Sequence, residues 1–191
     1  MIRHDMKAAT PRQQKIAAIY DADIWPLLPQ RTAESILRRI PRIAGAQVLE
    51  VGAATGKLTL SLAATLDEAS RVLAIDDSPA MLEQADMAKR QHADGAKVSF
   101  QVADVSPPWP VNDGAYDLAV SNLALADASD CKAAVVALAR SLKPGGHLVI
   151  TLPLRGSWAE FLDLYADVLT EQGKREGLAT LRAYQAAQPN A

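Results

Sequence analysis

The stretch VLEVGAATGKLTLSLA, residues 48–63, decides the fold, because an apolar strand pattern runs through a glycine-containing loop into a helical pattern. Gly52 can adopt a tight turn, and Gly56 permits close approach of the helix to the strand. Loops of this kind bind ligands at the carboxyl ends of strands in open parallel sheets. Ala54 stands where a dinucleotide-binding loop carries its middle glycine, so close contact with a pyrophosphate is disfavoured.

The same loop does not match the mononucleotide-binding pattern G-x-x-x-x-G-K-[ST]. Three residues instead of four separate Gly52 from Gly56, and Leu58 follows Lys57 where a hydroxyl is needed. Glu50, at the end of the strand, directs a negative charge toward the loop. Because a carboxylate there attracts cationic groups and repels a polyphosphate, the loop predicts a positively charged ligand without phosphate.

Five apolar runs predict the strands of the sheet: 46–51, 71–75, 97–102, 116–121 and 147–152. Most lack polar alternation, which is typical of parallel strands buried on both faces. Helical patterns separate the runs, except for the proline-containing segment 106–114, which predicts an extended loop. Ser78-Pro79 and Lys143–Gly146 predict a helix start and a tight turn into the fifth strand. The order of elements predicts an α/β fold.

Composition limits the function classes. A chain of 191 residues with 49% hydrophobic residues supports one domain with a substantial core. The net charge of −2 argues against nucleic-acid binding, and the single cysteine and three scattered histidines predict no metal site. No apolar run is long enough to cross a membrane, and no signal peptide precedes the core. We therefore expect a cytoplasmic protein.

Residues 48–63 resemble the first motif of the class I S-adenosylmethionine-dependent methyltransferases, in the form E-x-G-x-x-x-G. The segments 73–85, 102–105, 116–125 and 142–153 are similar to the family's later motifs, in the same order. The resemblance covers about residues 40–155. It implies a three-layer Rossmann-like sandwich with a mainly parallel sheet in the order 3-2-1-4-5. S-adenosyl-L-methionine carries an ammonium, a sulfonium and no phosphate, so it also suits the charge of Glu50.

The resemblance implies roles for individual residues. Asp76 would hold the ribose hydroxyls, Asp104 and Val105 would bind the adenine, and Asn122 and Leu123 would lie beside the methionine part. The full set of expected cofactor-binding residues is Glu50, Gly52, Ala53, Ala54, Gly56, Asp76, Asp77, Met81, Asp104, Val105, Asn122 and Leu123. Tyr20 and Trp25 are candidates for a lid or substrate pocket. Each role has a structural alternative. The acids could cap helices, Asp104 could form a simple turn, and Met81 and the aromatic residues could pack in the core.

The family pattern also implies a domain organisation. Residues 1–44 are expected to form an N-terminal helical lid, residues 45–155 the cofactor-binding core, and residues 156–191 two helices packed on the same domain. The family's sheet ends in an antiparallel pair, but only helical patterns follow Leu152. We therefore expect the final hairpin to be missing or truncated. Because an open sheet edge normally needs cover, a helix, another chain or a homodimer partner should shield the fifth strand.

The implied reaction is methyl transfer to a small-molecule acceptor by in-line displacement. The fourth strand is followed by SNLA, residues 121–124, and not by the N/D-P-P-Y/F tetrad of enzymes that methylate exocyclic amines of bases. Ala126 replaces a histidine that often follows LAL in the small-molecule branch, so no catalytic residue is predicted. The alternative is a non-catalytic protein that keeps the fold as an interaction or regulatory module. A nicotinamide-dependent dehydrogenase is disfavoured by Ala54.

Overall fold

The computed structural model describes residues 9–188, so the first eight residues of the predicted lid lie outside the described part. The chain divides into two compact units, residues 1–151 and 152–191. The first unit contains the sheet and the second contains two helices. The predicted packing of the C-terminal helices on the core stays a prediction.

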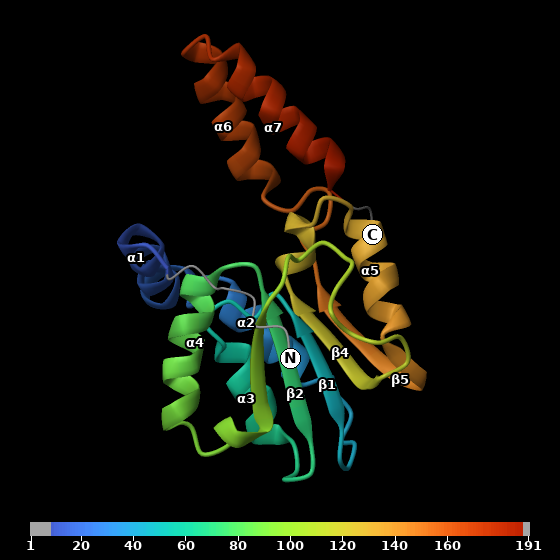
Figure 1. The fold of residues 1–191 in the computed structure, drawn as a ribbon. Helices are drawn as coiled ribbons and strands as arrows, with labels where there is room; N and C mark the ends of the chain where they lie inside the picture. Colours follow the sequence, from blue (N-terminus) through green and yellow to red (C-terminus); the bar gives the residue numbers. More distant parts are fainter. Residues whose placement is uncertain (1–8, 189–191) are drawn as a thin grey trace. The chain divides into compact units, whose positions relative to one another are not determined.

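The sheet of the first unit has five parallel strands in the order β3-β2-β1-β4-β5, which confirms the predicted fold class. The strands are β1 (Gln47–Val51), β2 (Arg71–Asp76), β3 (Val98–Val102), β4 (Tyr116–Asn122) and β5 (Leu142–Thr151). Figure 1 shows them side by side in this order, with α4 beside the β3 edge and α5 beside the β5 edge. The strand order reverses between β1 and β4, and there the carboxyl ends of the strands leave a crevice for ligands.

The helices of the first unit begin close to the residues that the sequence predicts. They are α1 (Pro11–Ile19), α2 (Pro29–Leu37), α3 (Lys57–Thr65), α4 (Pro79–Gln91) and α5 (Cys131–Arg140), with short 3-10 turns at Gly95–Lys97 (η2) and Ala124–Asp127 (η3). The Ser78 hydroxyl accepts a hydrogen bond from the Met81 amide, which confirms the predicted start of α4. Thr10 and Gln13 form a capping box at the start of α1.

The core lies between the sheet and the helices that follow and precede β1. Strand β1 is buried from Val48 to Val51, as expected for a central parallel strand. The largest cluster joins Val48, Val72, Leu118 and Val120 of the strands to apolar residues of α2 and α3. A smaller cluster places Leu82 and Ala85 of α4 against Ala53 and Ala74.

A π-helix, η1 (Tyr20–Ile24), directly continues α1. The start of the last strand differs from the prediction. Strand β5 starts at Leu142 and not at His147, so Lys143–Gly146 form an irregularity within the strand and not a turn before it. Leu142 already pairs with Tyr116, and a register shift between Tyr116 and Leu118 accommodates the extra residues.

The second unit is a hairpin of α6 (Ala159–Glu171) and α7 (Arg175–Ala187), which lie side by side in Figure 1. Gly173, between the two helices, has a φ of +65°, which glycine adopts easily. Leu162, Leu169 and Leu181 form the shared core. The described residues after Thr151 contain no strand, and within residues 9–188 the sheet partner of β5 is β4 alone. The expected cover of that edge stays a prediction. No helix in the described part of the chain could span a membrane.

Replacing Gly52 by alanine should destabilise the fold strongly. Gly52 has a φ of +83°, and a Cβ atom there would lie 2.0 Å from the Ala124 Cβ atom. The left-handed backbone and the clash together should lower the free energy of unfolding by roughly 2–4 kcal/mol, measured by urea denaturation. Gly114→Ala is the matched control, because Gly114 has a φ of +67° and no atom within 4 Å of the added Cβ. Equal losses in the two variants would contradict the importance of the contact with Ala124.

Candidate functional site

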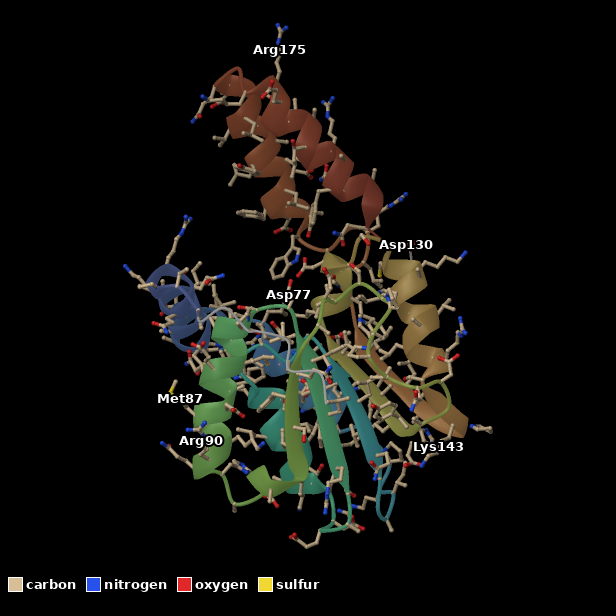
Figure 2. The ribbon with its side chains drawn as sticks, in the orientation of Figure 1. Asp77, Met87, Arg90, Asp130, Lys143 and Arg175 are labelled. Carbon is tan, nitrogen blue, oxygen red and sulfur yellow. The ribbon has the colours of Figure 1, made fainter. Side chains whose placement is uncertain are left out.

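A cavity of about 300 Å³ lies at the carboxyl ends of the strands, beside the loops that follow β1, β2 and β4. In Figure 2, Asp77 marks this end of the sheet and Lys143 marks the opposite end. The volume falls at the lower end of the range for small-molecule sites. The lining residues are Tyr20, Pro29, Gly52, Ala54, Asp76, Asp77, Ser78, Met81, Val105, Asn122, Leu123, Ala124 and Asp127.

The backbone amides of the loop after β1 are engaged inside the protein. The amides of Gly52 and Ala53 donate to the Ile75 carbonyl over 2.8 and 3.0 Å, and the Gly56 amide donates to the Ala53 carbonyl over 2.9 Å. The Ala54 amide donates to Asp76 Oδ2 over 2.7 Å. Glycine-rich loops bind phosphate through free amides of this kind. These four amides therefore cannot form a phosphate cradle.

Asp76 joins the loops that follow β1 and β2. Its Oδ2 atom accepts from the Ala54 amide and its Oδ1 atom accepts from the Ser78 amide over 3.0 Å. Burial raises the pKa of the Asp76 carboxyl, which is 7% exposed, and the two amides oppose that rise. Each carboxyl oxygen has a second lone pair that can accept from a ligand at the cavity. The hydrogen bond also holds Ala54 at a φ of +46°, which is unfavourable for a residue with a Cβ atom.

Glu50 lies at the end of β1 with 1% of its surface exposed. Its Oε2 atom has no hydrogen-bond partner among the described residues. Burial raises the pKa of the Glu50 carboxyl to about 8, the Thr59 hydroxyl opposes the rise and the charge of Asp76 adds to it. Buried carboxyl oxygens normally have partners, and perturbed groups of this kind gather at ligand sites. Glu50 is therefore suited to a cationic ligand that would favour its ionised form.

Two further side chains line the cavity. Asn122 donates to the Pro29 carbonyl over 2.9 Å and accepts from the Thr151 hydroxyl over 2.8 Å, so it connects the end of β4 to α2 and β5. Tyr20 lines the cavity from η1. Burial, followed by the charges of Asp76, Asp21 and Glu50, raises the pKa of the Tyr20 phenol to about 12. The phenol is therefore protonated at neutral pH and can donate a hydrogen bond.

The cavity brings together nine of the sequence-predicted residues: Tyr20, Gly52, Ala54, Asp76, Asp77, Met81, Val105, Asn122 and Leu123. Glu50 is not part of the lining and is buried at the end of the neighbouring strand. Ala53 packs in the cluster with Leu82, and Gly56 is held against Ala85 and Phe100. These two residues shape the loop and do not face the cavity.

The structure places Asp104 and Trp25 outside the cavity. Asp104 is exposed, and its Oδ1 atom accepts from the Ser106 amide over 2.7 Å. This hydrogen bond is typical of a local turn, which is the alternative to adenine binding for Asp104. Its carbonyl accepts from the Trp109 indole over 2.9 Å. Trp25 packs against the largest apolar cluster, as expected from the packing alternative.

Four lining residues escape the sequence analysis as site residues: Pro29, Ser78, Ala124 and Asp127. The sequence could have indicated Ser78, because it directly follows Asp76 and Asp77. A serine in this position is, however, equally typical of a helix N-cap. Asp127 lies on η3 at the rim, where partial burial, with the charge of Asp77, raises the pKa of its carboxyl. Pro29 reaches the site through a long-range contact, because its carbonyl accepts from the Asn122 side chain, 93 positions away in the sequence.

Glu50→Gln should change how stability depends on pH. Because the pKa of Glu50 is raised in the folded chain, its contribution is fully present below about pH 4.5 and is lost as the pH rises through about 8. The wild-type chain without ligand should therefore lose on the order of 3 kcal/mol of unfolding free energy across this window relative to Glu50→Gln. Denaturant titrations across the window measure the difference. Parallel curves for the two proteins would show that Glu50 is not perturbed.

The chain matches known proteins over the region that forms this site. A family model described as a methyltransferase domain matches residues 48–146. The malonyl-[acyl-carrier protein] O-methyltransferase of Paenibacillus sp. is 30% identical over 190 residues, covering 94% of this chain and 68% of that protein. The trans-aconitate 2-methyltransferase of Methylobacterium nodulans is 36% identical over 123 residues, covering 64% of this chain and 44% of that protein. The chain thus spans about half to two thirds of the length of these relatives.

A solved structure shares the fold. A putative methyltransferase of Haloferax volcanii, determined in complex with the Trm112 methyltransferase activator, aligns with a TM-score of 0.63 and 26% identity. The alignment covers 77% of this chain and 62% of that chain. S-adenosyl-L-methionine is therefore the expected cofactor. Two features fit it: Glu50 Oε2 has no partner within residues 9–188, and the Ala54 amide is bonded to Asp76 and not free for a phosphate. The chain belongs to the class I S-adenosylmethionine-dependent methyltransferase superfamily.

Proposed function

We propose that the chain transfers a methyl group from S-adenosyl-L-methionine to a small-molecule acceptor. The observation that carries the proposal is the buried Glu50 carboxyl, whose Oε2 atom has no partner among the described residues. It lies at the end of β1, directly before a loop in which the Gly52, Ala53, Ala54 and Gly56 amides donate to internal acceptors. A ligand with positive charge and no phosphate satisfies both features, and S-adenosyl-L-methionine has this chemistry.

The roles of the residues follow from their places around the cavity. When bound, the cofactor supplies an electrophilic methyl group on a sulfonium. Asp76 binds the ribose hydroxyls through the lone pairs that the Ala54 and Ser78 amides leave free. Glu50 provides the negative charge that compensates the cationic amino acid part. Met81 and Val105 give the adenine an apolar surface.

The chemistry of the lining suggests what kind of acceptor it serves. The ionisable lining residues are Tyr20 and the aspartates at 76, 77 and 127, with no lysine, histidine or cysteine among them. Tyr20 keeps its proton at neutral pH, because its pKa is raised to about 12. A strong general base is therefore lacking in the lining, and catalysis rests on positioning, which can supply about 7–11 kcal/mol in favourable cases.

We infer that the acceptor brings a nucleophile with no proton to lose first, such as a carboxylate or a neutral amine. The names of the two relatives, which refer to trans-aconitate and to a malonyl group, are consistent with an acid. The net charge of −2 argues against a nucleic acid as acceptor.

The test combines a binding variant with a turnover assay. Asp76→Ala should weaken the binding of S-adenosylhomocysteine at least about 30-fold, because hydrogen bonds to a charged group are lost. Asp86→Ala is the matched control, since Asp86 lies on α4, is not part of the cavity lining and forms an ion pair with Arg90 over 3.9 Å. Isothermal titration calorimetry measures both. Equal affinity of the two variants would contradict the role of Asp76.

Turnover is measured with methyl-labelled S-adenosyl-L-methionine and two panels of acceptors. Carboxylic acids and primary or secondary amines should accept the label, whereas alcohols and phenols should not. Labelling of the second panel alone would contradict the inferred acceptor chemistry. Tight binding of S-adenosylhomocysteine with no transfer to any acceptor would favour the alternative, a non-catalytic module.

A further inference from the structure

The carboxylate of Asp21 is the point where the N-terminal segment meets the cofactor loop and α4. Its Oδ1 atom accepts a hydrogen bond from the Thr55 hydroxyl. Its Oδ2 atom accepts from the Gln84 side-chain amide over 2.9 Å and lies 3.5 Å from Lys57 Nζ. We refer to Asp21, Thr55, Lys57 and Gln84 as the Asp21 cluster.

Burial makes the hydrogen bonds of this cluster important. Thr55 is 2% exposed, and within the described part of the chain its hydroxyl donates to Asp21. A buried hydroxyl or amide that loses its partner is costly. The Asp21 side chain is itself 25% exposed. The ion pair with Lys57 is more exposed and contributes less than the two hydrogen bonds.

The cluster lies next to the cavity but does not line it. Tyr20, the residue before Asp21, does line the cavity. Both residues belong to the π-helix η1, in which the Trp25 amide donates to the Tyr20 carbonyl over 2.8 Å. π-helical turns are rare and often occur at functional sites. Here the turn lets adjacent residues reach the cavity and the Asp21 cluster.

A second, outer contact holds the same segment. Glu83 on α4 accepts from the Ala9 amide over 3.2 Å and from the Gln14 side chain over 3.4 Å. The Gln14 bond is exposed, so it competes directly with water. Asp21 is therefore the inner attachment of the N-terminal segment, and it is the one that contacts the loop after β1.

We propose that Asp21 is a positioning residue that holds the N-terminal segment, with Tyr20 at the cavity, and couples the attachment of this segment to the conformation of the loop 52–56. Because Thr55 belongs to that loop, a ligand that orders the loop also strengthens the attachment of the segment, and the reverse holds by linkage. The coupling to S-adenosyl-L-methionine rests on the proposed function. The attachment itself is a property of the chain without ligand.

Hydrogen exchange measured by mass spectrometry tests the attachment on the full chain without ligand. Asp21→Asn should speed exchange in residues 11–24 about tenfold, because the amide cannot accept from Thr55 and Gln84 together. Asp23→Asn is the matched control: Asp23 lies in the same π-helix, is exposed and makes no side-chain hydrogen bond among the described residues. It should stay within about twofold of wild type.

Thr55→Val provides a second variant from the other side of the contact, and it should speed exchange in the same residues. Slow exchange in β1 and β4 shows that each variant is folded. If Asp21→Asn and Thr55→Val both exchange like Asp23→Asn, the attachment is wrong. That comparison needs no cofactor, so it decides the inference even if the chain binds no S-adenosylhomocysteine.

The coupling has its own readout. Saturating S-adenosylhomocysteine should slow exchange in residues 11–24 of the wild type and of Asp23→Asn, and much less in Asp21→Asn. Asp21→Asn should also raise the Michaelis constant for the cofactor about tenfold while leaving kcat within about threefold. A loss in kcat with an unchanged Michaelis constant, or equal protection in all three proteins, would overturn the coupling.

Discussion

The double hydrogen bond of the Asp76 carboxylate is the interaction on which the site depends. It fastens the loop after β1 to the turn after β2 through the Ala54 and Ser78 amides. The left-handed conformation of Ala54 is unfavourable for an L-residue with a Cβ atom, and the hydrogen bond to Asp76 compensates for that cost. The same bond removes the Ala54 amide from the cavity. One side chain therefore shapes the loop and excludes phosphate from it.

Glu50 complements this arrangement with charge. Parallel strands end at the same edge of a sheet, so Glu50 and Asp76 come close together once β1 and β2 pair in register. Burial is the main cause that raises the pKa of both carboxyl groups, and the charge of Asp76 raises the pKa of Glu50 further. A cationic ligand would favour the ionised form of Glu50 and lower its pKa.

The sequence predicts the features that depend on local patterns. Apolar runs indicate the five strands, and the positions of Gly52, Asp76 and Asn122 at strand ends place them at the cavity. It cannot predict contacts that depend on how distant segments fold together. Thr55 donates to Asp21, which is 34 positions away in the sequence, and Asp21 lies in a π-helix that the local sequence pattern does not indicate. For Trp25 and Asp104 the sequence suggests a site role that the structure does not support, since Trp25 packs in the core and Asp104 forms a turn. Residue type alone does not distinguish these structural roles from ligand binding.

The most direct test of the account is a calorimetric comparison of two adenosine ligands, one with a zwitterionic amino acid tail and one with an anionic polyphosphate tail. S-adenosylhomocysteine carries an ammonium group, whereas adenosine diphosphate carries a polyphosphate. The account predicts that the first binds and that the second does not compete with it, because the Gly52, Ala53, Ala54 and Gly56 amides are engaged and because an ammonium group, unlike a polyphosphate, favours the ionised form of the buried Glu50 carboxyl. Tighter binding of adenosine diphosphate than of S-adenosylhomocysteine would contradict it.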